Sequence, residues 1–395
     1  MRKVYLDHAA TTPVRPEVVT AMQPFWTEEF GNASSIHQWG RRARIAVEES
    51  REKIAKILNC TPTEIIFTGT NTLSDNLAIS GVACALAEEE NKALEALHLI
   101  TSQVEHHAVF DTFKALEKQG FQVTYLPVDR QGLVNIEDLG KAIKPNTVLV
   151  SIMYANNEVG TIQPLLEIST ICQEQSKKRG TRIYFHTDAA TVADYLTLDT
   201  KKLGVDLLTL GAHKFGGPKG IGILYIKKRT PIRPLTFGGN HERKLYPGTE
   251  AVPLIVGMAK ALEIAEKEKK EAFLRVTKLR EKLIAGVLDI SEVTLTGHPT
   301  RRLPEIASFV VKGAEGESLV LLLDNEGIAS STGSACTSGT FSPSHVLLAM
   351  GYKPEDAHGS LRFSLGKETD EEDINYVLEV FPKIVEKLRK MAPKL

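Results

Sequence analysis

One stretch of the chain decides the fold class, Val205-Asp-Leu-Leu-Thr-Leu-Gly-Ala-His-Lys-Phe-Gly-Gly-Pro-Lys-Gly-Ile-Gly-Ile-Leu-Tyr-Ile226. Its two apolar runs, Val205 to Leu210 and Ile221 to Ile226, predict two strands, and the glycine-rich segment between them predicts a connecting loop. Lys214 lies in this loop beside His213, which suits a lysine whose amine forms a Schiff base. A surface lysine in a glycine-rich turn is the more common arrangement, so other segments must decide between the two.

Around this stretch, the chain alternates between helical periodicity and short apolar runs from about Arg41 to Ile226. This alternation predicts an α/β domain with a mostly parallel sheet. The remaining predicted strands and two of the predicted helices share this pattern: strands Glu64–Phe67, His98–Ser102, Gln122–Pro127, Val148–Met153 and Arg182–His186, and helices Asp111–Gln119 and Leu165–Lys178.

A long helical pattern from Val252 to about Val287 leads into a second, α+β module. There the pattern predicts strands and helices over Val293–Thr296, Ile306–Val311, Glu317–Glu326 and Asp370–Arg389, with a break of the last helix at Pro382. No linker rich in Pro, Gly or Ser separates the modules, so we expect the boundary in or beside the long helix. The expected division is a large cofactor-binding domain, 16–264, and a small domain made of 1–15 and 265–395.

The composition favours a globular protein that binds a small molecule. The chain has 395 residues, 42% of them hydrophobic, and a formal net charge of -1. This balance argues against nucleic acid or an anionic membrane as the main partner. The N-terminus has no apolar targeting region, and no apolar run approaches the roughly 18 residues of a membrane span. We therefore expect a cytoplasmic protein.

The four cysteines show none of the paired spacings of zinc or redox motifs, so neither a metal site nor a disulfide framework is expected. Cys60, Cys84 and Cys172 lie in helix-like contexts and are predicted to be small buried hydrophobes. Cys336 differs because its surroundings, Ala329 to Ser342, are small and polar. Such a loop leaves a thiol accessible.

Polar segments follow the predicted strands, where open α/β sheets bind their ligands. Thr68 to Asp75 combines a glycine with several hydroxyls before a helical pattern from Asn76, which suits an anion site or an ordinary helix cap. His106 and His107 follow a second strand, and either ring could stack on a ligand or act as an acid or base. The polar run from Tyr154 to Gly160, which contains Asn157, follows a third strand and exceeds what a plain loop needs.

Asp188 follows a fourth strand, where its carboxylate could pair with a buried cation such as a pyridinium nitrogen or cap the next helix. Taken together with Lys214, these segments provide one partner for each group of pyridoxal phosphate: the phosphate, the ring face, the phenolic oxygen, the ring nitrogen and the aldehyde. The set therefore predicts a pyridoxal phosphate enzyme, although none of these segments would do so by itself.

The sequence resembles the cysteine desulfurases, in the class V aminotransferase-like branch of the fold-type I pyridoxal phosphate enzymes, and within them the long-loop group. The resemblance runs from Tyr5 to the end of the chain. It is carried by Tyr5-Leu-Asp-His-Ala-Ala-Thr-Thr-Pro13, Phe30-Gly-Asn-Ala-Ser-Ser35, Glu105-His106, Asn156-Asn157-Glu158, His213-Lys214, Gly217-Pro-Lys-Gly220, Gly238-Gly-Asn-His-Glu-Arg243, Ser334-Ala-Cys336-Thr-Ser338 and Leu361-Arg362-Phe-Ser-Leu-Gly366.

Carried over by position, the resemblance implies catalytic roles for Lys214, Cys336 and His106. Lys214 would bind the cofactor aldehyde, His106 would stack on the ring, and the Cys336 thiolate would take sulfur from L-cysteine as a persulfide, leaving L-alanine. Arg362 would bind the substrate carboxylate, and Asn157 would lie near both the substrate and the phenolic oxygen. The residues expected at the cofactor are Asn71, Thr72, His106, Asn157, Asp188, Thr191, His213, Lys214 and Thr249.

Among these, Asp188 would pair with the ring nitrogen, Thr72 and His213 would hold the phosphate, and Thr249 would reach the phosphate of the neighbouring subunit in a homodimer. The resemblance also implies a sulfur-acceptor or scaffold protein as partner, for iron-sulfur clusters or thiolated cofactors.

Some positions depart from the family pattern. Thr191 replaces a usual glutamine at the phenolic oxygen, Gly211 replaces a serine at the phosphate, Tyr246-Pro247 replaces Arg-Ser, and Leu73 replaces a glutamate. Each lost contact is worth on the order of 1 kcal/mol, so we expect weaker retention of the cofactor than is usual.

Two alternative functions stay open at this point. One is a selenocysteine lyase or another β-lyase of the same branch, for which Cys336 would be dispensable. The other is a sulfur carrier or assembly partner whose cofactor chemistry is impaired at the altered positions.

Overall fold

A computed structural model describes residues 2–89, 93–333 and 343–391. Its largest sheet has seven strands in the order β2-β8-β7-β6-β5-β3-β4. The strands of this sheet are β2 (Ile65–Thr68), β3 (His98–Ser102), β4 (Gln122–Leu126), β5 (Thr147–Ser151), β6 (Tyr184–Asp188), β7 (Leu207–Gly211) and β8 (Gly222–Ile226). All seven lie where the apolar runs predicted them, and the predicted α/β class with its mostly parallel sheet is confirmed.

The helices of this part either precede β2 in the chain or lie between the strands of the sheet. They are α1 (Pro16–Met22), α2 (Pro24–Thr27), α3 (Gln38–Leu58), α4 (Asn71–Glu89), α5 (His107–Lys118), α6 (Ile136–Ala142), α7 (Leu165–Arg179) and α8 (Thr200–Leu203), with 3-10 turns at Pro62–Glu64, Leu94–Ala96, Ala212–Lys214 and His241–Lys244.

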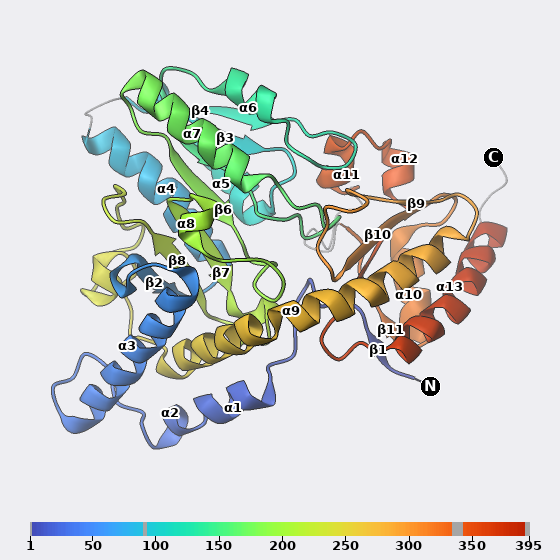
Figure 1. Ribbon diagram of the computed structural model, residues 1–395, viewed down its shortest axis with the longest axis horizontal. Coiled ribbons are helices and arrows are strands. Elements are labelled where there is room, and N and C mark those ends of the chain that lie inside the picture. The colour runs from blue at the N-terminus through green and yellow to red at the C-terminus, as the bar shows by residue number, and fades with distance from the viewer. Residues whose placement is uncertain (1, 90–92, 334–342, 392–395) are drawn as a thin grey trace.

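The sheet is buried on both faces because its strands are apolar at nearly every position. In β2, for example, Ile65 and Phe67 point into one core while Ile66 points into the other. Helices α4 and α5 belong to the core that contains Ile66, whereas α3, α7 and α9 (Val252–Leu288) belong to the other. The result is a three-layer arrangement with helices on both sides of the sheet, as Figure 1 shows.

Strand β8 is the exception to parallel pairing, since it runs antiparallel to both β2 and β7. The cause is local: the short 212–221 connection is long enough for a turn but not for the helical crossover that a parallel neighbour requires. The Lys214 loop predicted between two strands is therefore the turn of an antiparallel pair.

The second part of the molecule contains the short strands β1 (Val4–Tyr5) and β11 (Ile328–Ala329), which pair in parallel, and an antiparallel sheet of order β12-β10-β9. Its remaining elements lie around these: β9 (Val293–Leu295), β10 (Ile306–Val311), β12 (Ser360–Ser364), α10 (Gly316–Asn325), α11 (His345–Ala349), α12 (Pro354–Ala357) and α13 (Glu371–Met391). This is the smaller α+β module that the sequence predicted.

Helix α9 joins the two parts. Its first half, through Ala265, packs in the core of the large sheet, and its second half, from Val276, packs in the core of the small one. Figure 1 shows the helix running from one part into the other. These two cores support the division 16–264 against 1–15 and 265–395, which stays a prediction.

Two expectations about helices were wrong. Helix α13 is not broken at Pro382, because Val380 and Phe381 before it and Ile384 and Val385 after it are all buried in one core, which holds the helix together across the missing hydrogen bond. Helix α4 begins at Asn71 and not at Asn76, so the end of the Thr68–Asp75 segment is the first turn of a helix.

Within the described ranges, no helix is long and apolar enough to cross a membrane.

Burial in the small core predicts a matched pair of stability effects on α9. Leu283→Ala removes a side chain that is 0% exposed, whereas Leu274→Ala changes one that is 64% exposed on the same helix. We expect the first to destabilise the protein by about 2–5 kcal/mol and the second by less than about 0.5 kcal/mol. Thermal unfolding followed by circular dichroism compares the two; equal midpoints would contradict the assigned core.

Candidate active site

The predicted site residues gather where strands of the large sheet end. Asp188 is the last residue of β6, and His106 precedes α5 shortly after β3. Lys214 lies in the 3-10 turn directly after β7, the strand that pairs with β6. The carboxyl ends of parallel strands thus bring together three residues that are far apart in the sequence.

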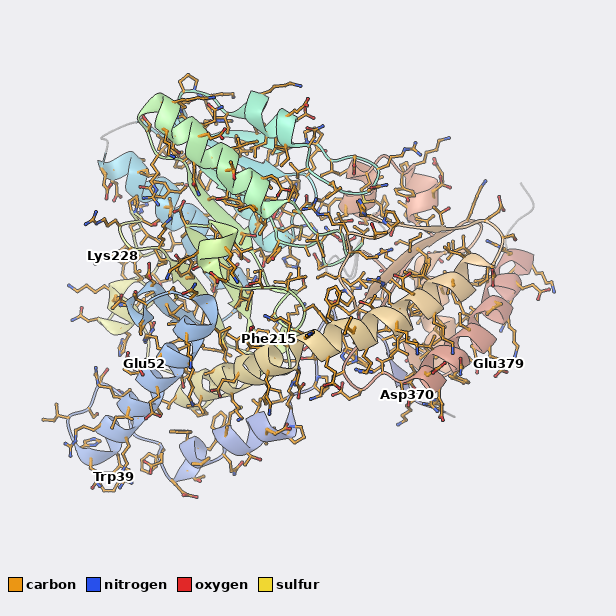
Figure 2. All side chains as sticks on the ribbon, viewed as in Figure 1. Trp39, Glu52, Phe215, Lys228, Asp370 and Glu379 are labelled. Carbon is orange, nitrogen blue, oxygen red and sulfur yellow. The ribbon has the colours of Figure 1, made fainter. Side chains whose placement is uncertain are left out.

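Lys214 is held at the turn by its neighbours. Phe215, the next residue, is buried in the core that also contains residues of α9, and Figure 2 labels it beside that helix. The Lys214 Nζ atom donates to the carbonyl oxygens of Ala9 at 2.5 Å and Ala10 at 2.9 Å. The N-terminal segment therefore forms one wall of the site.

His213 faces the same segment. Its Nδ1 lies 3.2 Å from Thr11 Oγ1, and its carbonyl oxygen accepts from Thr12 N. Burial, with the charges of Lys214 and Lys219, lowers the pKa of His213 to about 4. The imidazole is consequently neutral at neutral pH.

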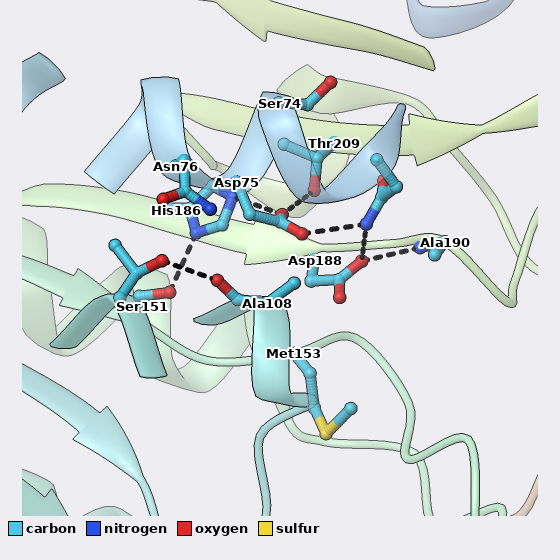
Figure 3. Close-up of polar contacts among 12 residues, drawn as sticks. Ser74, Asp75, Asn76, Ala108, Ser151, Met153, His186, Asp188, Ala190 and Thr209 are labelled. Carbon is cyan, nitrogen blue, oxygen red and sulfur yellow. Dashed lines mark hydrogen bonds and ion pairs between the residues drawn. The ribbon is translucent and has the colours of Figure 1, made fainter. Parts of the chain in front are cut away.

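Asp188 is buried and fixed by two donors. Its Oδ1 accepts from Asn71 Nδ2 at 3.1 Å and from Ala190 N at 2.9 Å. Asn71 Nδ2 also donates to Asp75 Oδ2 at 2.9 Å. Figure 3 shows Asp75 and Asp188 side by side, with Thr209 and His186 next to Asp75. Asn71 thus contacts the carboxylate predicted to pair with the ring nitrogen.

His106 is oriented by the helix that it starts. Its Nδ1 accepts from Ala108 N at 3.1 Å, which leaves Nε2 as the protonated nitrogen of the neutral ring. Burial lowers the pKa of His106, Asp188 opposes this shift, and Lys214 adds to it. Of the two adjacent histidines that the sequence left open, His106 is the more buried and the one influenced by Asp188 and Lys214.

Arg362 lies on β12 and is 3% exposed. It donates to Asp7 Oδ1 at 2.9 Å and to the carbonyl oxygen of Asn157 at 2.8 Å. Its Nε is buried and has no hydrogen-bond partner among the described residues. Arg362 thus retains a donor for a further acceptor, and it ties Asn157 to the small domain.

The remaining predicted residues lie at the edge of the site when a single chain is considered. Thr72 is exposed on the first turn of α4, and Thr191 lines a cavity of about 50 Å³ together with Lys214. Thr249 lies in a separate hollow of about 220 Å³ beside Gly69 and Tyr246, so its predicted contact with a neighbouring subunit stays a prediction. Cys336 lies outside the described residues.

Three buried carboxyls surround the site, and the sequence alone indicated no role for any of them. Burial raises the pKa of Glu105 to about 8 and that of Glu158 to about 7. Burial, and then the charge of Asp188, raise the pKa of Asp75 well above its usual value. Asp75 stood within the predicted anion-binding segment, but only the start of α4 at Asn71 turns it inward.

Of the three cysteines predicted to be buried, only Cys172 is; the prediction was wrong for Cys60 and Cys84, which are half-buried. Burial raises the pKa of Cys60 and of Cys172 to about 12, so neither is a thiolate at neutral pH. Cys60 follows α3 and is half-buried, as is Cys84, while Cys172 is buried in α7.

The residues present fit pyridoxal phosphate. A fixed carboxylate, Asp188, suits the ring nitrogen, the neutral ring of His106 suits stacking, and Lys214 suits the aldehyde. The 19-residue helix α4 begins directly beside them, and Asn71 Oδ1 at its start is buried without a partner among the described residues. The fold and this site together define the class of protein: a two-domain α/β enzyme of the aminotransferase type.

Comparisons with known proteins agree. The family model described as Aminotransferase class-V matches residues 4–377. The chain is 51% identical over 393 residues to "Cysteine desulfurase IscS" of Dictyoglomus turgidum, covering 99% of this chain and 97% of that protein. It is 50% identical to "Cysteine desulfurase IscS" of Methanosarcina thermophila, covering 99% of this chain and 94% of that protein.

Among solved structures, a "NIFS-LIKE PROTEIN" superimposes with a TM-score of 0.89 at 40% identity, over 98% of this chain and 99% of that chain. The chain belongs to the class V aminotransferase family, and the resemblance to cysteine desulfurases inferred from its sequence is confirmed.

The buried neutral histidines predict acid sensitivity. Burial lowers the pKa of His186 to about 3, and burial with nearby cations lowers that of His98 and that of His213 to about 4. At these three histidines the unfolded chain binds protons near pH 6.5 and the folded chain does not, so their contribution to stability falls as the pH drops from about 6.5 toward 4. The buried carboxyls Glu105 and Glu158, whose pKa is raised, contribute in the opposite direction.

Thermal midpoints measured across this range test the expectation. His186→Gln should flatten the fall, while His358→Gln, at an exposed position, should leave it unchanged. The same pH dependence of the midpoint in the wild type and in His186→Gln would contradict it.

Proposed function

We propose that this protein is a pyridoxal phosphate-dependent cysteine desulfurase that converts L-cysteine to L-alanine and passes the sulfur to Cys336 as a persulfide. The observation that carries the proposal is the placing of Lys214 and Asp188 at the ends of neighbouring strands, in a chain that matches cysteine desulfurases over nearly its whole length. The comparisons support this function and give no support to a non-catalytic sulfur carrier.

The cofactor, when bound, supplies an electron sink for the carbanion formed at the substrate Cα. Asp188 would stabilise the positive charge on its ring nitrogen, and the neutral His106 would cover the ring face. The Lys214 amine, once it leaves the carbonyl oxygens of Ala9 and Ala10, is the base at this turn that would take the Cα proton.

Arg362 would bind the carboxylate of L-cysteine. Asp7 and the Asn157 carbonyl hold the guanidinium in place from one side, and the buried Nε keeps donor capacity for the substrate. Because Arg362 is 3% exposed, its charge is weakly screened and favours an anion strongly.

The Cys336 thiolate would attack the sulfur of the substrate. The bond between substrate sulfur and Cβ breaks, a sulfur-sulfur bond to Cys336 forms, and the electron pair left on Cβ takes a proton to give the methyl group of alanine. The described residues on either side of this segment meet at one carboxyl: Ser344 Oγ donates to Glu158 Oε2, and a Cβ on Gly333 would lie 2.8 Å from the same oxygen. Gly333 and Ser344 thus both lie beside Glu158, on which the charge of Arg362 acts.

We propose further a homodimer and an acceptor protein for the persulfide, serving iron-sulfur cluster or thiolated cofactor synthesis. Exposed side chains in and around α2 and α3 support a covered surface: Trp26 is 55% exposed, Phe30 66%, Ile36 91% and Trp39 51%. An apolar surface of this kind marks a protein-protein contact. A second copy there is the occupant that also gives Thr249 its predicted role, and we propose a cytoplasmic location for the dimer.

The function is tested by incubating the protein with pyridoxal phosphate, L-cysteine and a reductant. We expect alanine and sulfide in equal amounts, lost in Lys214→Ala and in Cys336→Ala, with Cys60→Ala as the matched control that retains both. Alanine formation at the full rate in Cys336→Ala would indicate a lyase that needs no persulfide. Absence of visible absorbance with the cofactor in the wild type would indicate a protein without cofactor chemistry.

We expect that replacing Thr191 can raise the affinity for the cofactor. Thr191→Gln restores a hydrogen-bond donor for the phenolic oxygen, and the cavity of about 50 Å³ that Thr191 lines with Lys214 offers room for the longer side chain. One hydrogen bond of about 1 kcal/mol corresponds to roughly fivefold tighter binding. Titration of the apoprotein with pyridoxal phosphate measures the dissociation constant, and an unchanged or weaker value in Thr191→Gln would refute the assignment.

A further inference from the structure

One amide group joins two buried carboxyls in this protein. Asn71 Nδ2 donates to Asp188 Oδ1 at 3.1 Å and to Asp75 Oδ2 at 2.9 Å. The two acceptors lie on different elements, Asp188 on β6 and Asp75 one turn along α4 from Asn71. The i,i+4 spacing on the helix places the Asn71 and Asp75 side chains on one face, and this face points at the strand end.

The orientation of the amide is determined by its surroundings. With its nitrogen toward the carboxyls, both N–H groups have an acceptor, whereas the reversed amide would place its oxygen against the Asp188 carboxylate. Asn71 Oδ1 then faces away from both acids and has no partner among the described residues.

Asp75 is built to be the neutral member of the pair. It is 0% exposed and lies beside the charge of Asp188, and both raise its pKa, while Thr209 Oγ1, which donates to its Oδ1 at 2.6 Å, opposes this in part. His186 Nε2 lies 3.6 Å from the same oxygen, while His186 Nδ1 is 2.8 Å from Ser151 Oγ. The Asp75 carboxyl thus lies beside Thr209 and His186, as Figure 3 shows. With Asp75 neutral, the negative charge of the pair stays on Asp188.

Two glycines make room for Asn71. Gly211 and Gly222 are paired in register across β7 and β8. A Cβ on Gly211 would lie 3.1 Å from Asn71 Cβ, and one on Gly222 would lie 2.8 Å from the Thr70 carbonyl carbon and 2.9 Å from Asn71 N. The first residue of α4 thus rests on a part of the sheet that has no side chains. A serine at 211 would meet the Cβ of Asn71.

We propose that Asn71 is a positioning residue for the desulfurase reaction: its amide holds the Asp188 carboxylate toward the cofactor ring against the buried Asp75, and the bare Gly211–Gly222 pair is the space that admits it. The inference rests on the proposed function, which it deepens. It also reverses one expectation drawn from the family pattern, because Gly211→Ser would meet Asn71 before it gained a contact to the phosphate.

The test compares Asn71→Ala, Asn71→Gly, Gly211→Ser and the double variant Asn71→Gly with Gly211→Ser. The references are the wild type and Asn76→Ala, a neighbouring amide on α4 that donates to the Thr72 carbonyl. Asn71→Ala should lower kcat about tenfold with little change in KM, because it removes a hydrogen bond to a charged group. The acid limb of the kcat/KM profile should move to higher pH, since Asp188 loses a donor that stabilises its charge. Asn76→Ala should change neither.

The steric part of the proposal is read from the apoprotein and so does not depend on catalysis. Gly211→Ser should lower the thermal midpoint of the apoprotein and weaken cofactor binding about fivefold. Adding Asn71→Gly, which removes the Cβ that a side chain at 211 would meet, should reverse both changes relative to Asn71→Gly alone. A kcat and an acid limb unchanged in Asn71→Ala would overturn the positioning role. Strictly additive effects of the two substitutions would overturn the steric coupling. A wild type that forms no alanine while the apoprotein shows the predicted coupling would instead sink the proposed function.

Discussion

The start of helix α4 on the glycine pair of β7 and β8 is the contact on which the site depends. Because Gly211 and Gly222 carry no side chains, the backbone of Thr70 and Asn71 approaches the sheet closely. That approach sets the direction of the helix and brings its first turn beside the end of β6. The same strand, β7, ends in the turn that holds Lys214, so one local contact fixes the helix start, the carboxylate and the lysine relative to one another.

Burial then decides which groups around the site carry charge. Asp75, Glu105 and Glu158 lie in the interior, where the cost of desolvation favours the neutral acid. His186 is buried and His106 and His213 are half-buried, and for them the same cost favours the neutral base. Asp188, which has two hydrogen-bond donors at one oxygen, is the carboxylate that these surroundings leave to balance a cationic ring. Which groups of the site are charged thus depends on how deeply each is packed, more than on how many ionisable residues the site contains.

The small domain contributes to the site through few but specific contacts. Arg362 reaches from β12 to Asp7 and to the Asn157 carbonyl, and Ser344 reaches Glu158. Around them a cluster that includes Val104, Met153 and Val310 closes the gap between the strand ends of the large sheet and the second domain. Together with the continuous helix α9, these contacts place the substrate-binding arginine opposite the cofactor-binding strand ends.

The sequence by itself determined the α/β class, the seven strands of the large sheet and the position of Lys214 between two of them, because apolar runs and glycine-rich turns are local signals. Its motifs also identified the family. The tertiary structure decided what depends on contacts between distant segments. Pro382 stays inside a helix because residues on both sides of it share one core, and Asp75 becomes part of the site because α4 begins at Asn71. Likewise, the family pattern suggested that Gly211 costs a contact to the phosphate. In the structure, its missing side chain instead leaves space for Asn71, which lies 140 residues earlier in the chain. These roles depend on steric and electrostatic contacts between residues far apart in the sequence, and no local pattern indicates such contacts.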